Sequence, residues 1–168
     1  EGLGLGDQLG ALGTLLDELV LDEHALLGRA ERQWQARRVR RTAFECAGLA
    51  QRVSDELNWL DAHWPEDLPQ SVIHADLFPD NVLMLGEQVT GLIDFYFSCT
   101  DIRAYDLAVT HSAWCFSNDG KIFFGDRAAA LGMGYDQAHG LTPAERAAFP
   151  ILCRGAALRF LLTRAYDW

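Results

Sequence analysis

The chain has 168 residues, of which 49% are hydrophobic, and its formal net charge is −10 at pH 7. This composition is typical of a folded domain, and the negative charge argues against nucleic acid or an anionic membrane as the main partner. No apolar run reaches the roughly 18 residues that a membrane-spanning helix needs, so the sequence predicts no such helix.

Helical patterns dominate the N-terminal part of the chain. Leucines recur at three- and four-residue steps over residues 7–20, which predicts an amphipathic helix. A longer helical pattern covers residues 37–63, and the proline-containing segment 64–70 ends it. The arginine-rich run at residues 29–41 is interpreted as a solvated helix face, with an RNA-binding or acidic-partner patch as the alternative.

Short apolar segments follow and are predicted to be β-strands. They cover residues 71–75, 81–85 and 89–95. The turn at residues 86–88 joins the last two strands as a hairpin, and residues 96–101 are expected to form a loop.

Helical patterns resume after this loop, over residues 102–116, 121–131 and 142–166. The last of these helices opens with Thr142 and Glu145 at the spacing of a capping box, and Pro143 occupies its first turn.

These elements predict an α+β fold that is mainly α, organised as a single domain over residues 1–168. Residues 1–64 are expected to be helical, residues 65–101 to carry the catalytic and metal loops on a small antiparallel hairpin, and residues 102–168 to be helical again.

Polar residues interrupt the predicted strands at His74, Asp76, Asn81 and Asp94. Acidic groups at strand ends are costly to bury unless something pairs with them, and a metal ion is one good partner. If the hairpin forms, Asn81 and Asp94 lie side by side as hard oxygen ligands suited to Mg²⁺. Asp76 would face the same cavity, where a carboxylate can accept a proton from an attacking hydroxyl. This set of groups is the minimum needed for phosphoryl transfer.

The segment HADLFPDN, followed by LIDF, resembles the catalytic loop and the metal-binding motif of protein-kinase-like phosphotransferases, with the same five-residue step from Asp to Asn. The loop has the form H-x-D, and the acid at the end of the strand, Asp94, is followed by Phe95 and then by Tyr96 rather than by glycine. Both features resemble the motifs of the aminoglycoside/choline phosphotransferase branch. The segments VIHADLFPDNVL, GLIDFYFSCTD, AYDLAVTHSAWCF and RGAALRFLLTRAYDW resemble the bacterial homoserine kinases of that branch.

The resemblance implies a role for each matching position. Asp76 would be the catalytic base, and Asn81 and Asp94 would hold Mg²⁺ on the phosphates of ATP. His74 would position Asp76, although a histidine that is simply satisfied in the core explains it equally well. Asp106 is expected to hydrogen-bond the catalytic loop, with a simple acid in the N-terminal turn of a helix as the alternative.

Candidate substrate residues follow from the charges of L-homoserine, which carries a carboxylate and an ammonium group. Arg103 and Arg159 are candidates for the carboxylate, because guanidinium binds it bidentately. Asp101 is a candidate for the ammonium group, while Tyr96 or Trp114 would line the pocket. Ordinary surface or core positions are the alternative for each.

An N-terminal lobe with a phosphate-binding lysine is also implied by the resemblance. No segment before residue 64 reads as the sheet of such a lobe, and the single lysine, Lys121, follows the catalytic loop. We therefore expect a C-terminal lobe alone, completed by a missing N-terminal lobe or a partner chain. The absence of an initiating methionine also suggests a fragment, and the N-terminus does not read as a signal peptide.

Other functions remain open at this point. The substrate could be choline, an aminoglycoside or another small alcohol, or the chain could be an inactive lobe that only binds. A metal-dependent hydrolase built on His74, Asp76 and Asp94 is disfavoured, because His111 and His139 are isolated in the sequence. The four cysteines show no metal-ligand spacing and are interpreted as buried thiols in a reducing cytoplasm.

Overall fold

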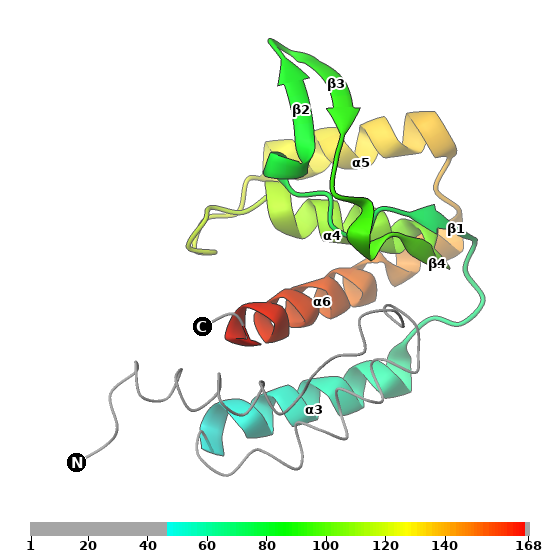
Figure 1. Ribbon diagram of the computed structural model, residues 1–168. Helices are drawn as coiled ribbons and strands as arrows, with labels where there is room; N and C mark the ends of the chain where they lie inside the picture. The colour runs from blue at the N-terminus through cyan, green and yellow to red at the C-terminus, as the bar shows by residue number, and fades with distance from the viewer. Residues whose placement is uncertain (1–46, 167–168) are drawn as a thin grey trace. The chain divides into compact units, whose positions relative to one another are not determined.

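The structure is a computed structural model that describes residues 47–166 (Figure 1). The chain divides into two compact units, and the unit of residues 65–156 contains the candidate site residues His74, Asp76, Asn81 and Asp94. The predicted helix at residues 7–20 and the arginine-rich run at residues 29–41 lie outside the described residues. No helix in the described part of the chain combines the length and hydropathy that crossing a bilayer requires.

The other unit contains helix α3 (Ala47–His63). Val53, Leu57 and Leu60 are 6%, 3% and 1% exposed, so one face of the helix is buried. Residues four and seven positions apart share a helix face, which explains why the predicted apolar stripe becomes the buried one.

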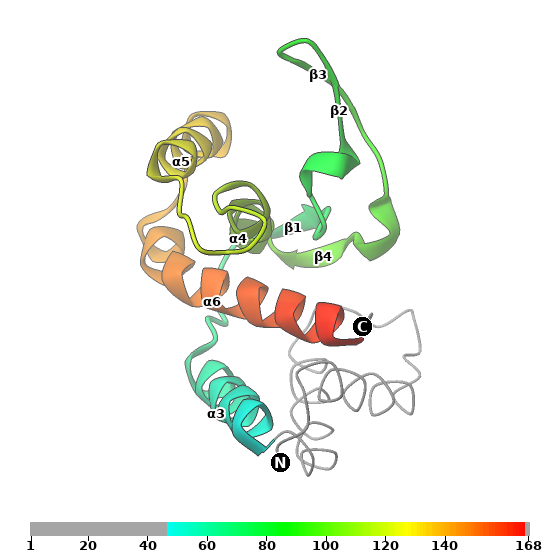
Figure 2. The same cartoon turned by 90° about the vertical axis from the view of Figure 1, so that its left-hand side faces the viewer.

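Two separate two-stranded antiparallel sheets lie in the unit of residues 65–156. Strand β1 (Gln70–Ile73) pairs with β4 (Cys99–Ile102), and β2 (Val82–Leu85) pairs with β3 (Gln88–Leu92). Figure 2 shows the β2–β3 hairpin extending away from the β1–β4 pair.

Strand β4 corrects the prediction of a loop at residues 96–101. A short 3-10 turn occupies Phe95–Phe97, and the chain then pairs with β1 in a register that sets Ile73 opposite Cys99. The segment CTDI has no clear apolar alternation, so its strand conformation depends on the ladder that a distant partner supplies.

Helix α4 (Arg103–Trp114) is the centre of this unit. It contacts β1 and β4 as well as α5 (Gly125–His139), and Figure 2 shows it between them. Its buried residues are Ala104, Tyr105, Leu107, Ala108, Val109 and Thr110. A helix that is apolar around most of its circumference is suited to such a position.

Helix α5 starts and ends later than the predicted 121–131. Residues before it form a turn closed by a bridge between Phe116 and Phe123, with Gly120 at φ +69°. The helix ends at His139, and the next residue, Gly140, adopts φ +66° and donates its N–H to the carbonyl of Asp136 at 2.8 Å. A glycine in the left-handed region commonly ends a helix, whereas internal glycines only weaken one.

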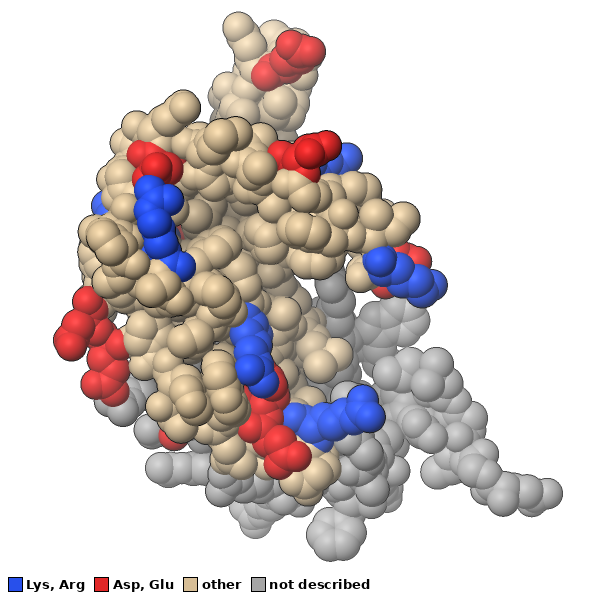
Figure 3. All heavy atoms as spheres, turned by 180° about the vertical axis from the view of Figure 1, so that it is seen from behind, with Lys and Arg blue, Asp and Glu red and all other residues tan. Residues whose placement is uncertain are grey.

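Charged side chains of both signs lie scattered over the face seen in Figure 3, without a concentrated basic patch. The β2–β3 hairpin exposes several large hydrophobic side chains. Its side chains that are large, hydrophobic and at least 41% exposed are Leu83, Met84, Leu85, Val89 and Leu92.

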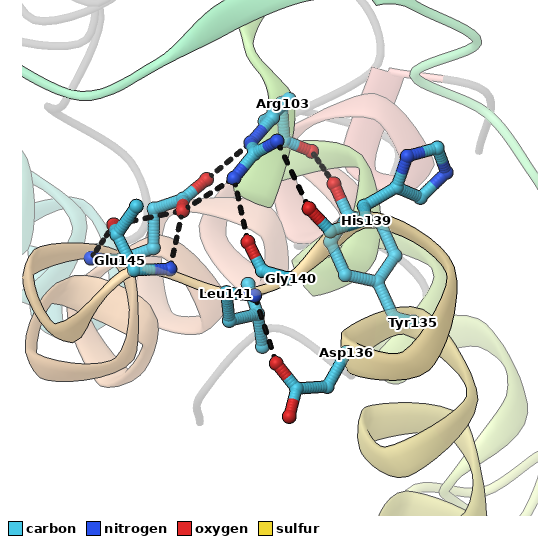
Figure 4. Close-up of polar contacts among 8 residues, drawn as sticks. Arg103, Tyr135, Asp136, His139, Gly140, Leu141 and Glu145 are labelled. Carbon is cyan, nitrogen blue, oxygen red and sulfur yellow. Dashed lines mark hydrogen bonds and ion pairs between the residues drawn. The ribbon is translucent and has the colours of Figure 1, made fainter.

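A partly buried ion pair connects α4 to the start of α6 (Pro143–Tyr166). Arg103 donates from Nε to Oε1 of Glu145 at 2.7 Å and from Nη2 to Oε2 at 2.8 Å, and Glu145 is fully buried (Figure 4). The Nη2 group also donates to the carbonyl of Gly140 at 2.9 Å. This bidentate geometry fixes both the distance and the orientation of the two helices.

The predicted capping box forms within the same network. The Thr142 hydroxyl and backbone N–H both donate to Oε2 of Glu145 at 2.8 Å, and the N–H of Glu145 donates to the Thr142 hydroxyl at 3.2 Å. Hydrogen bonding from Arg103, with that from Thr142, lowers the pKa of Glu145 from 4.5 to about 2. Glu145 therefore remains ionised well into the acid range.

We predict that this carboxylate makes stability depend on pH. Because folding lowers the pKa of Glu145, its contribution is complete above about pH 4.5 and is lost as the pH falls towards about 2. Glu145→Gln should lower Tm by several degrees at pH 7, and the difference from the parent should shrink over that range. Thermal unfolding followed by circular dichroism between pH 7 and 2.5 measures it.

Glu87→Gln is the matched control, since Glu87 is an exposed carboxylate in the turn of the β2–β3 hairpin. It should leave Tm close to that of the parent protein. A difference between Glu145→Gln and the parent that stays constant down to pH 2.5 would contradict the prediction.

Candidate active site

The backbone that follows β1 is held by a carboxylate of α4. Asp106 accepts the N–H of His74 at 3.1 Å and that of Ala75 at 2.7 Å, one with each carboxylate oxygen. Ala75 is fully buried and adopts φ +63°, in the left-handed region. That conformation costs about 1–2 kcal/mol for a residue with a Cβ atom, and the two hydrogen bonds to the Asp106 side chain help to offset this cost.

His74 joins the loop after β1 to the end of β3. Its Nε2 is 2.9 Å from the carbonyl oxygen of Ile93, and its Nδ1 accepts the N–H of Asp76 at 3.3 Å. Since a carbonyl can only accept, these two contacts assign the ring proton to Nε2. The ring centroid also lies 4.7 Å from that of Phe95. His74 is thus 94% buried and hydrogen-bonded at both nitrogens.

The loop that contains Asp76 is closed by Asn81, at the end of a short 3-10 turn (Pro79–Asn81). The Asn81 side chain donates from Nδ2 to the carbonyl of Asp76 at 2.8 Å and lies 3.5 Å from Oδ2 of the same residue. Two backbone bonds complete the loop, from Phe78 N to Asp76 O at 2.8 Å and from Asn81 N to Phe78 O at 3.0 Å.

Asn81 and Asp94 are brought together by the β2–β3 hairpin. The ladder continues past Leu92, where the N–H of Ile93 donates to the carbonyl of Asn81 at 3.0 Å. Asp94, the next residue, is exposed and adopts φ +61°. Its carboxylate makes no hydrogen bond or ion pair with the described residues.

The donor chemistry of this pair suits a magnesium ion. The Asn81 amide donates from nitrogen to Asp76, which leaves its oxygen able to coordinate, and the Asp94 carboxylate has no hydrogen-bond or ion-pair partner among residues 47–166. Residues 47–166 contain no cluster of three histidine, cysteine or acidic side chains. Magnesium typically uses only one or two carboxylates together with phosphate oxygens and water, so such a cluster is not required.

The indole of Trp114 lies against the same loop, and its Nε1–H donates to the carbonyl of Leu77 at 2.9 Å. Sequence reasoning placed Trp114 in the pocket lining but not this bond. It also missed the left-handed conformations of Ala75 and Asp94, for which a non-glycine residue leaves no sequence signal.

The remaining candidate substrate residues differ in their surroundings. Tyr96 is 56% exposed, whereas Asp101 is buried and accepts the N–H of Ile102 at 2.7 Å. Arg103 forms an ion pair with Glu145 and is therefore not available to bind a substrate carboxylate. Arg159 belongs to the other unit, where its guanidinium lies 5.2 Å from the ring centroid of Phe160.

Known proteins that resemble this chain include phosphotransferases and kinases. Residues 4–148 match the model of the phosphotransferase enzyme family, APH. The homoserine kinase of Zymomonas mobilis subsp. mobilis is 61% identical over 122 residues, which cover 73% of this chain and 38% of that protein. The homoserine kinase of Methylobacterium radiotolerans is 62% identical over 121 residues, 72% of this chain and 37% of that protein. The chain thus spans less than two fifths of these relatives.

A crystal structure of an aminoglycoside-3′-phosphotransferase of type VIII resembles this structure with a TM-score of 0.51. The two are 22% identical, and the match covers 92% of this chain and 63% of the other. This likeness concerns the fold, and it confirms the predicted protein-kinase-like architecture. With its family match over residues 4–148, the chain belongs to the phosphotransferase enzyme family.

Proposed function

We propose that this chain serves in the transfer of the γ-phosphoryl group of ATP to the hydroxyl of L-homoserine, giving O-phospho-L-homoserine. The observation that carries the proposal is the arrangement of Asp76, Asn81 and Asp94 around one hydrogen-bonded loop. The identity of 61–62% to two homoserine kinases supports the choice of substrate.

In the proposed reaction, the substrate hydroxyl oxygen attacks the γ-phosphorus, and the bond to the leaving ADP oxygen breaks. The hydroxyl proton passes to the carboxylate of Asp76. The N–H of Asp76 donates a hydrogen bond to His74, and the side chain of Asn81 donates one to the carbonyl of Asp76. These two hydrogen bonds restrain the backbone that carries the base. A restrained base contributes through its position as well as through its basicity.

Asn81 and Asp94 are the residues that would hold Mg²⁺ and, through it, ATP. When bound, the ion would neutralise charge on the phosphate oxygens. The chain's own contribution is to present two oxygen ligands from adjacent hairpin positions, which the Ile93–Asn81 backbone bond keeps in register. The second ligand is exposed and has no competing protein partner among the described residues.

The direct test is ADP release by the purified chain with Mg·ATP and L-homoserine, with choline and an aminoglycoside assayed in parallel. We expect turnover with homoserine to exceed that with the other alcohols. Equal or greater turnover with another alcohol contradicts the substrate, and no turnover with any of them contradicts kinase activity of this chain.

Asp76→Asn is predicted to lower kcat by about 10²–10⁴-fold, the usual contribution of general-base catalysis, because the amide cannot accept the proton. The KM for ATP should change little, since Asp76 is not among the proposed metal ligands. Asp80→Asn is the matched control, an exposed carboxylate in the same loop, and it should retain activity. Steady-state kinetics measures both, and a loss below about tenfold in Asp76→Asn argues against its role as base.

Asp94→Ala is predicted to weaken binding of Mg·ATP because it removes a proposed metal ligand. When Mg²⁺ is titrated at constant ATP, the Mg²⁺ concentration that gives half-maximal activity should rise by about tenfold or more. Mutating residues that only hydrogen-bond to metal ligands already lowers metal affinity by about this much. Glu87→Ala, an exposed carboxylate at the other end of the hairpin, should leave the midpoint unchanged. An unchanged midpoint in Asp94→Ala rules out the metal assignment.

A further inference from the structure

The indole of Trp114 contacts the peptide that follows the proposed base. Its Nε1–H donates to the carbonyl of Leu77 at 2.9 Å, and Leu77 is the residue after Asp76. This bond therefore acts on the backbone that determines where the Asp76 carboxylate points. The bond also satisfies the indole N–H of this half-buried tryptophan.

Helix α4 holds the catalytic loop at two places. Near its start, Asp106 accepts the N–H groups of His74 and Ala75, and at its last residue Trp114 donates to Leu77. The two helix positions are about 12 Å apart along the axis at 1.5 Å per residue. Contacts at both ends of one rigid helix restrict rotation of the loop between them.

The end of α4 is itself fixed, so the indole is presented from a defined position. Arg127 of α5 donates from Nη1 to the carbonyl of Trp114 at 3.3 Å, while its guanidinium lies 4.3 Å from the ring centroid of Phe124. The next residue, Cys115, is fully buried and donates its N–H to the backbone carbonyl of His111 at 3.0 Å.

We propose that Trp114 is a positioning residue for phosphoryl transfer, which fixes Asp76 through the carbonyl of Leu77. The inference rests on the proposed function, because it assigns Asp76 as the base. It differs from the predicted pocket-lining role, which would affect substrate affinity. A positioning role affects the rate at which the enzyme–substrate complex reacts, since misplacing a reacting group lowers kcat.

The kinetic test compares Trp114→Phe with Trp59→Phe, the same substitution in α3. Loss of one well-placed hydrogen bond should lower kcat by about tenfold, while KM for L-homoserine stays within about twofold. Trp59→Phe should leave both parameters unchanged. A rise in KM at unchanged kcat would indicate pocket lining and would overturn the proposal.

A second measurement does not depend on activity. Amide hydrogen exchange followed by NMR should show the N–H groups of Phe78 and Asn81 exchanging about tenfold faster in Trp114→Phe, because their loop bonds open more often. The amide of Val109, in the buried part of α4, should be unaffected. Unchanged exchange in the loop, or an equal increase at Val109, would overturn the positioning role.

The two measurements separate failure of this inference from failure of the proposed function. If the parent chain releases no ADP with L-homoserine, the proposed function fails, and the exchange data alone decide whether Trp114 holds the loop. If the parent is active and Trp114→Phe matches it in both kcat and loop exchange, only the inference about Trp114 fails.

Discussion

The carboxylate of Asp106 is the constraint on which the geometry of this site depends. It accepts the N–H groups of two consecutive residues, His74 and Ala75, and so determines the direction in which the chain leaves β1. Helix α4 can supply this group because it begins beside the start of β1, where the N–H of Arg103 donates to the carbonyl of Pro69 at 3.0 Å. The helix then runs back along β1 towards the catalytic loop, where the indole of Trp114 meets Leu77.

Arg103 and Glu145 provide the corresponding constraint on the other side of α4. The same arginine that begins the helix is bound to a fully buried carboxylate, and it also donates to the carbonyl that ends α5. A buried charge is costly unless it is paired and hydrogen-bonded, and both oxygens of Glu145 are satisfied by Arg103 and Thr142. Three helices are thereby tied together close to the first turn of the helix that carries Asp106.

Local patterns predicted much of this arrangement. The apolar stripe of α3, the capping box at Thr142 and the hairpin that sets Asn81 near Asp94 all depend on neighbours within a few residues or on a short turn. Contacts between distant segments were beyond such reasoning. Strand β4 exists because β1 pairs with it, and Arg103 resembled a substrate ligand until its partner, 42 residues away, was known. Nothing in the sequence distinguishes an arginine that binds an internal carboxylate from one that binds a ligand.

The backbone of Ala75 has a consequence for the sequences that this position can accept. Ala75 is fully buried at φ +63°, and branching at Cβ is especially unfavourable in that conformation. Saturation mutagenesis at codon 75 should therefore recover alanine and glycine almost alone among functional clones. Glycine adopts this conformation without the Cβ clash but loses more conformational freedom on folding. Alanine and glycine at this position should therefore give proteins of similar stability. The variable residue of the H-x-D motif is then restricted by its backbone conformation, although its side chain carries no chemistry.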